Sequence, residues 1–328
     1  MAERKVGKVI YRQAFSPILE LFRIVPEDGS PFPDYKPGQY IALSRENCRI
    51  TKKVLGEKGE TRYLYDHDEE GKPKRGSVTH SYSISSAPFE TKQKGYLEFY
   101  VVLEMVETEM PGRLSESLFH LDPETDNKIL FMNKITGEFT LDKRAFGFQN
   151  IVMVGTGTGL APFASMVKQL YFEAMEGNRH DARVTLFHAN RSLDELGYHQ
   201  ELLSIEASRR LDFVYVPSVS RPTSRDNDDS GLGKGRAGNI LRHVLRMPLK
   251  EEEDLRRSME SGGDIPATKK NLDKTVKPIL PSHIQREMLL ERMEPGKTVI
   301  LTCGNPAVMD DIKVISATNN IRFEKEDW

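Results

Sequence analysis

A glycine-rich run near the middle of the chain has the composition of a phosphate-binding turn. It spans residues 155–163 and reads Gly-Thr-Gly-Thr-Gly-Leu-Ala-Pro-Phe. It directly follows the apolar segment 150–154 and precedes a segment of helix-like composition. Glycines let a backbone approach a pyrophosphate closely, and the N–H groups that begin a helix supply donors and a favourable dipole. This order predicts a nucleotide site, and the alternative is a tight strand-to-helix turn that binds nothing.

The spacing of the glycines limits the kind of nucleotide site. The run reads Gly-x-Gly-x-Gly, whereas the Rossmann dinucleotide fingerprint reads Gly-x-Gly-x-x-Gly. We therefore assign the run to another family of nucleotide-binding proteins.

A second group of candidate residues lies upstream, at residues 80–86, and reads His-Ser-Tyr-Ser-Ile-Ser-Ser. With the preceding turn Pro-Gly-Gln-Tyr at residues 37–40, it resembles the ferredoxin–NADP(+) reductase family, whose Arg-x-Tyr-Ser motif holds FAD. The resemblance implies that Tyr82 packs on the isoalloxazine ring and that Ser83 hydrogen-bonds near its reactive N5 atom. His80 replaces the arginine that contacts the FAD pyrophosphate in the family, and histidine is a weaker, pH-dependent cation.

Three further segments match the family in the same order along the chain. Residues 97–102 alternate like a half-buried strand and resemble the strand beside the flavin. Residues 112–115 resemble the helix start that binds the FAD pyrophosphate, with Ser115 as the expected N-cap, and an ordinary capped helix is the alternative. Residues 303–309 resemble the Cys-Gly-x-Pro-x-Met element, whose cysteine faces the nicotinamide. The alternative for Cys303 is a small buried thiol at a strand end.

The resemblance implies two sets of cofactor contacts. The residues expected to contact FAD are His80, Ser81, Tyr82, Ser83, Tyr100, Val101, Val102, Gly112, Arg113, Leu114, Ser115, Thr158 and Trp328. The residues expected to contact NADP(H) are Gly157, Thr158, Gly159, Arg191, Ser220, Arg221, Arg236, Gly304, Asn305 and Pro306. Ser83, Cys303 and Trp328 are expected at the reacting centre. No metal site is expected.

Three arginines favour NADPH over NADH. The 2′-phosphate of NADPH is a dianion that forked guanidinium groups bind well. Arg191 and Arg221 follow strand ends and match family positions that bind this phosphate, and Arg236 is a weaker third candidate. The alternative for each is a loop arginine that faces solvent.

The chain ends at Trp328, its only tryptophan. In the family the terminal segment often places an aromatic ring on the flavin face where the nicotinamide must bind. A terminal tryptophan resembles the bacterial members, and its stacking would have to be displaced by the nicotinamide. The alternative is a frayed tail.

The elements that must position these residues divide into two kinds. Short alternating segments dominate the first part and predict an antiparallel β-barrel, with residues 45–78 as an insertion or long hairpin. From residue 150 buried-type strands alternate with helix-length segments, which predicts a parallel sheet. We therefore expect an FAD-binding barrel at residues 1–147 and an NADP(H)-binding α/β domain at residues 148–328, with a surface insertion near residues 247–282.

Composition narrows the class of protein further. A formal net charge of −2 gives no general attraction to nucleic acid or to anionic membranes. The two cysteines are too few to bind an iron–sulfur cluster, and no apolar run approaches a membrane span. Because the N-terminus also lacks an apolar signal core, we expect a cytoplasmic protein without stable membrane insertion.

The function that these observations favour is electron transfer. We expect a flavoprotein that passes electrons between NADP(H) and a one-electron protein carrier, ferredoxin or flavodoxin, through FAD. One alternative is an NADH-dependent flavin reductase of the cytochrome b5 reductase or oxygenase-component type. Another is a non-catalytic flavin-binding electron-transfer subunit.

Overall fold

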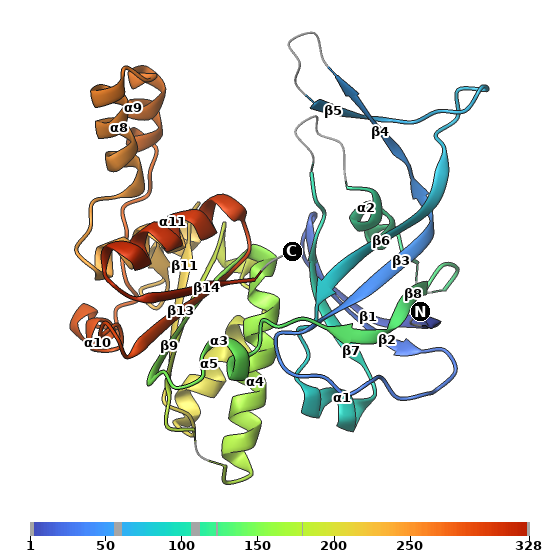
Figure 1. Cartoon of the computed structure of the whole chain (residues 1–328), viewed down its shortest axis with the longest axis horizontal. Coiled ribbons are helices and arrows are strands. Elements are labelled where there is room, and N and C mark those ends of the chain that lie inside the picture. The colour runs from blue at the N-terminus through green and yellow to red at the C-terminus, as the bar shows by residue number, and fades with distance from the viewer. Residues whose placement is uncertain (1–2, 56–60, 106–111, 123, 179, 327–328) are drawn as a thin grey trace. The chain divides into compact units, whose positions relative to one another are not determined.

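The computed structural model describes residues 3–55, 61–105, 112–122, 124–178 and 180–326 (Figure 1). The chain forms two compact units, Met1–Glu138 and Phe139–Trp328. The assignment of FAD to residues 1–147 and of NADP(H) to residues 148–328 concerns ligands and stays a prediction.

The first unit is built on one antiparallel six-stranded sheet, as predicted. Its strand order is β6-β3-β8-β1-β2-β7, with strands β1 (Arg4–Ser16), β2 (Leu19–Pro26), β3 (Tyr40–Arg49), β6 (Arg75–Ser83), β7 (Leu97–Val102) and β8 (Lys128–Thr136). The chain beyond β6 bonds to β7, because the Ser85 amide donates to the Glu98 carbonyl at 2.9 Å. In β8 the buried Ile129 and Phe131 alternate with more exposed residues, so the sheet covers an apolar core with one face.

A second, two-stranded sheet extends from this unit. Strands β4 (Thr51–Leu55) and β5 (Thr61–Tyr65) pair antiparallel, which confirms the hairpin predicted within residues 45–78. Two short helices complete the unit, α1 (Pro88–Lys94) and α2 (Arg113–Phe119). The expected N-cap Ser115 is wrong: α2 is capped by Gly112, and Ser115 lies inside its first turn.

The second unit is built on a parallel six-stranded sheet, also as predicted. Its order is β12-β11-β10-β9-β13-β14, with strands β9 (Asn150–Thr156), β10 (Arg183–Asn190), β11 (Phe213–Val219), β12 (Gly233–Lys234), β13 (Thr298–Cys303) and β14 (Arg322–Lys325). Five of the connecting segments matter for the site: η1 (Gly157–Leu160), α4 (Ala161–Met175), η2 (Leu193–Glu195), α7 (Ala237–Val244) and α11 (Pro306–Thr318). The remaining helices are α3 (Leu141–Arg144), α5 (His199–Ser208), α6 (Ser224–Asp228), α8 (Lys250–Ser261), α9 (Ile265–Asp273) and α10 (Arg286–Glu291).

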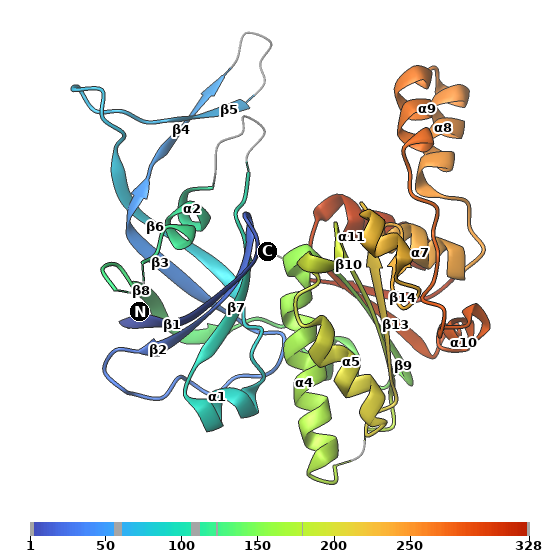
Figure 2. The same ribbon diagram turned by 180° about the vertical axis from the view of Figure 1, so that it is seen from behind.

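Helices cover both faces of this sheet. One face packs with α7, α10 and α11 in a core that includes Ile240, Leu289 and Ile312. Figures 1 and 2 show α4 and α5 on the other side. The short helix α10 contributes the buried Leu289 to this core, and Ile284 and Met293, just beyond its two ends, are buried as well.

The segment predicted as a surface insertion contains a helical hairpin. Helices α8 and α9 pack against each other and project from the second unit (Figure 2). The chain then returns to the sheet, where Ile279 forms an antiparallel bridge with Lys234 of β12. None of the described helices has the length and apolar composition needed to cross a membrane.

Candidate functional site

The parallel sheet places two predicted motifs at its topological switch point. The chain leaves β9 for β10 on one side and later adds β13 on the other side. In open α/β sheets of this kind, ligands bind outside the carboxyl ends of the strands at such a point. The glycine run follows β9 and the cysteine element follows β13, so both lie where a ligand is expected.

These two motifs are in backbone contact. A Cβ atom on Gly159 would lie 2.2 Å from the carbonyl oxygen of Cys303, and one on Gly304 would lie 2.5 Å from Oγ1 of Thr156. Gly304 also has a φ of 126°, which side chains rarely adopt. The structure therefore brings residues 157–159 and 304–306 together, and glycine is required at positions 159 and 304.

The turn after β9 fits a phosphate-bearing ligand. Gly157 has a φ of 55° and leads into η1 and then α4, whose first turn carries no acidic residue. The Thr156 hydroxyl at this turn is buried and has no hydrogen-bond partner among the described residues. Free backbone donors, a helix start and an unused hydroxyl are what an anionic ligand can satisfy. On α11, by contrast, the Asn305 side chain caps the helix by accepting from the Ala307 amide at 2.9 Å.

Cys303 forms a buried pair with a residue that the sequence analysis did not assign. Its Sγ donates to Oε2 of Glu326 at 2.8 Å, and both side chains are buried. Burial and then the Glu326 charge raise the pKa of the Cys303 thiol well above its usual value. Cys303 is thus a protonated hydrogen-bond donor at neutral pH, not a thiolate. Trp328, the other expected residue here, lies outside the described residues.

The three arginines follow the carboxyl ends of adjacent strands. Arg191 comes after β10 and Arg221 after β11, and the Arg221 amide donates to the Arg191 carbonyl at 2.8 Å. The Ser220 hydroxyl donates to the Asn190 carbonyl at 3.2 Å. Arg236 follows β12 and caps α7. The residues predicted to bind the 2′-phosphate therefore lie together along the carboxyl ends of β10, β11 and β12.

Two of these arginines already have carboxylate partners. Arg191 binds Glu195 through a forked pair, with Nε to Oε2 at 2.7 Å. Arg236 Nη1 lies 3.0 Å from Oε1 of Glu251. Arg221 is exposed and forms no ion pair within the described chain. Glu195 and Glu251 were not among the residues predicted for this site.

In the first unit, the expected flavin residues lie along the edge strand β6. Tyr82 is half-buried, burial raises the pKa of its phenol, and its hydroxyl has no hydrogen bond to any described residue. Ser83 is buried, whereas His80 and Ser81 are exposed. An aromatic ring on the end strand of the described sheet, with a hydroxyl that bonds to no described residue, fits a planar ligand such as a flavin.

His80 contributes little positive charge. Partial burial and then the charge of Arg113 lower its pKa from the ordinary value of 6.5, while Glu104 opposes them. The imidazole is therefore neutral at pH 7, and Arg113 is the cation beside it. At the position of the family's motif arginine, this chain therefore has the neutral His80 ring, and Arg113 of α2 supplies the positive charge nearby.

The start of α2 is tightly built around Gly112. The Gly112 amide donates to the Glu104 carbonyl at 2.6 Å, and the Ser115 hydroxyl donates to the Gly112 carbonyl at 3.2 Å. A Cβ on Gly112 would lie 2.8 Å from that hydroxyl. The Ser115 side chain is thus occupied locally. Among the other expected contacts, Val101, Leu114 and Tyr100 have buried side chains, and Val102 is exposed.

Two histidines that were not predicted, His188 of β10 and the half-buried His199 at the start of α5, lie against a tyrosine of β11. His188 and His199 both approach the Tyr215 hydroxyl through Nδ1, at 3.0 and 3.1 Å. His188 is fully buried, and its Nε2 has no partner in the part of the chain that the structure describes. Burial, with a smaller contribution from His199, lowers the pKa of His188 to about 3.

We expect this histidine to weaken the fold in acid. The folded state keeps His188 neutral down to a pKa of about 3, whereas an unfolded histidine binds its proton near 6.5. The neutral His188 therefore contributes fully to the free energy of unfolding above pH 6.5. That contribution falls by about 1.4 kcal/mol per pH unit as the pH drops from 6.5 toward 3. Urea unfolding at several pH values should show a shallower acid loss for His188→Asn than for the wild type. Equal pH dependence would show that His188 does not cause it.

Comparisons with known proteins place this geometry among oxidoreductases. A family model described as the oxidoreductase NAD-binding domain matches residues 153–256. The flavohemoprotein of Halalkalibacterium halodurans is 26% identical over 244 residues, which are 74% of this chain and 49% of that protein. The ferredoxin–NADP reductase of Azotobacter vinelandii is 27% identical over 184 residues, 53% of this chain and 63% of that protein.

A solved structure matches both units. The crystal structure of a ferredoxin NADP+ reductase from Neisseria gonorrhoeae with bound FAD and NADP covers 99% of each chain, with a TM-score of 0.59 and 20% identity. At this identity the likeness shows the fold. This chain spans about half the length of the curated relatives that it matches.

Proposed function

The chain belongs to the ferredoxin–NADP(+) reductase family, and from that premise we propose that it is an FAD-dependent enzyme that exchanges electrons between NADP(H) and a one-electron protein carrier, ferredoxin or flavodoxin. The observation that carries the proposal is the contact of Gly159 with the Cys303 carbonyl. This contact brings the glycine turn that would bind phosphate next to the buried Cys303–Glu326 pair, at the switch point of the parallel sheet. A site of this kind suits a dinucleotide whose reacting ring lies near Cys303.

In this proposal each unit holds one cofactor. Tyr82 and Ser83 of β6, with Arg113 of α2, would bind FAD, which supplies a two-electron acceptor that can pass electrons on singly. Gly157 and Gly159 would bind the pyrophosphate of the pyridine nucleotide. The Cys303 thiol, held protonated by burial and by Glu326, would orient the nicotinamide and keep water from it.

A second candidate is an NADH-dependent reductase. Glu195 and Glu251 hold two of the three arginines, which lowers the positive charge available to a 2′-phosphate. Flavohemoproteins among the relatives are also consistent with an electron acceptor other than ferredoxin. A non-catalytic subunit is less well supported, because the chain carries both the glycine run at residues 155–163 and the cysteine element at residues 303–309.

Anaerobic stopped-flow reduction of the FAD-loaded protein by NADPH and by NADH tests the proposal. Fast bleaching of the flavin by NADPH, followed by oxidation with ferredoxin or flavodoxin, would support it. Faster bleaching by NADH would favour the second candidate. Bleaching by neither nucleotide would favour a subunit without its own nicotinamide site.

Arg221→Ala should selectively weaken the use of NADPH. Arg221 is the exposed arginine of the three without a carboxylate partner, so a charged hydrogen bond to the 2′-phosphate would be lost. A bond of this kind contributes about 1.5–3 kcal/mol, which predicts a roughly 10- to 100-fold increase in the KM for NADPH and little change for NADH. Arg225→Ala, at a neighbouring exposed arginine, is the control. Equal effects of Arg221→Ala on both nucleotides would remove Arg221 from the phosphate site.

A further inference from the structure

The helical insertion meets the sheet beside one of the candidate phosphate-binding arginines. Hydrogen bonds of the Asn239 side chain join the first turn of α7, which begins directly after Arg236, to the first turn of α8. Glu251, in that first turn of α8, reaches Arg236 with its Oε1 atom, 3.0 Å from Nη1. The insertion therefore contributes a carboxylate to the edge of the sheet where a nucleotide phosphate is proposed to bind.

The position of this carboxylate is fixed. Glu251 Oε2 accepts a hydrogen bond from Asn239 Nδ2 at 2.7 Å, and Asn239 Oδ1 accepts one from the Lys250 amide at 3.0 Å. The Glu251 side chain is only 8% exposed, whereas that of Arg236 is 70% exposed. Movement of Glu251 away from Arg236 would break the hydrogen bond from Asn239 Nδ2.

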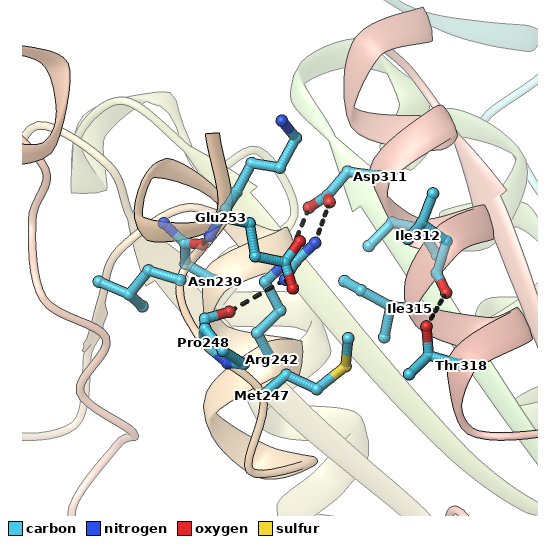
Figure 3. Close-up of polar contacts among 12 residues, drawn as sticks. Asn239, Arg242, Met247, Pro248, Glu253, Asp311, Ile312, Ile315 and Thr318 are labelled. Carbon is cyan, nitrogen blue, oxygen red and sulfur yellow. Dashed lines mark hydrogen bonds and ion pairs between the residues drawn. The ribbon is translucent and has the colours of Figure 1, made fainter. Parts of the chain in front are cut away.

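A buried ion cluster holds the whole turn in place. Figure 3 shows Arg242 of α7 between Glu253 of α8 and Asp311 of α11. Its Nη1 lies 2.8 Å from Glu253 and its Nη2 lies 2.7 Å from Asp311, and it is fully buried. Arg242 Nη1 also donates to the Pro248 carbonyl, just before α8, at 3.0 Å. The insertion is thus fastened to both neighbouring helices.

Arg236 and Glu251 share the wall of a cavity. This cavity has a volume of about 460 Å³ and is also lined by Lys250, Lys274 and Asp311. A 2′-phosphate that bound Arg236 here would come close to the Glu251 carboxylate. The same arrangement recurs at Arg191, which is held by the buried Glu195. A phosphate and a carboxylate that share one arginine repel each other strongly where water is partly excluded.

We propose that Glu251 is a specificity-determining residue for the pyridine nucleotide. Its fixed negative charge offsets that of Arg236, so the insertion weakens the binding of a 2′-phosphate and lowers the preference for NADP(H) over NAD(H). This inference rests on the proposed function, because it assumes that the adenosine end of the nucleotide binds at this edge.

The test is equilibrium binding of two fragments to the full chain, measured by calorimetry. One is 2′,5′-ADP, which carries the 2′-phosphate, and the other is 5′-AMP, which lacks it. Glu251→Gln keeps a side-chain oxygen for Arg236 and removes the charge. We expect it to bind 2′,5′-ADP about five- to tenfold more tightly and 5′-AMP within twofold of the wild type. Glu260→Gln, at the exposed end of the same helix, should change neither affinity.

Further variants separate the possible results. Glu251→Leu removes the charge without placing an amide against Asn239, and should also tighten 2′,5′-ADP. In the Glu251→Gln background, Arg236→Ala should abolish the gain. Unchanged or weaker binding of 2′,5′-ADP by both stably folded Glu251 variants would overturn the proposal. Wild-type protein that bound neither fragment would overturn the nucleotide site itself, and with it this inference.

Discussion

Replacing Gly159 with alanine should destabilise the second unit by about 3 kcal/mol or more and abolish nucleotide binding. The added Cβ would lie 2.2 Å from the Cys303 carbonyl oxygen, 2.4 Å from its carbon and 2.5 Å from the Gly304 Cα. All three are backbone atoms at the end of β13, so no side chain can rotate to make room. The turns after β9 and β13 would have to separate, and the phosphate-binding turn would lose its shape.

Urea unfolding and calorimetry with 2′,5′-ADP would measure the two effects. Gly157→Ala is the matched control in the same turn, because a Cβ there would meet no atom within 4 Å. Its φ of 55° predicts a smaller loss of about 1–2 kcal/mol. If Gly159→Ala were no more destabilising than Gly157→Ala, the contact between the two strand ends would not constrain the site.

The local pattern of the sequence predicted most of the architecture. Residues 97–102 were predicted as a half-buried strand; β7 occupies that range, but Leu97 to Val101 are all buried, so the predicted alternation of burial was wrong. Residues 151–154 are a continuous apolar run followed by glycine, which is typical of a buried parallel strand, and β9 includes them. Each of these patterns comes from a strand's own periodicity and from the turn that ends it, so neighbouring residues suffice to show it.

The helices of the insertion were harder to predict for a physical reason. In α8 only Glu251 is buried, so the helix has no apolar stripe to mark its period. Its ends do carry local signals. Gly262 ends α8 with a φ of 73°, and the Asp264 side chain caps α9. These residues had been assigned only to a surface insertion without predicted helices, and they form the turn between two helices.

The partners of the site residues could not be predicted because the fold creates them. Glu326 is 23 positions from Cys303, and Glu251 is 15 positions from Arg236. Such pairs depend on which strands and helices become neighbours, and local periodicity does not contain that information. Glu195, four positions after Arg191, is an exception that charge spacing could have revealed.

Replacing Arg242 with methionine should destabilise the second unit by about 3–5 kcal/mol at pH 7. Arg242 is fully buried, and the charges of Glu253 and Asp311 raise its pKa although burial alone would lower it. Methionine would fill much of the space but would leave two carboxylates close together with no cation, and the Pro248 carbonyl without its donor. Urea unfolding of the variant and the wild type would measure the loss.

The pH dependence and two further variants identify the cause of this loss. Two unpaired carboxylates should bind protons more readily, so the deficit of Arg242→Met should be smaller at pH 5 than at pH 7. Arg242→Met combined with Glu253→Gln and Asp311→Asn should recover part of the stability, because the cluster of these three side chains would then carry no charge. Lys250→Met removes a half-exposed partner of Asp254 in the same region and should cost no more than about 0.5 kcal/mol. A loss in Arg242→Met that neither acid nor the triple variant reduced would point to packing, and the cluster would then not fasten the insertion through its charges.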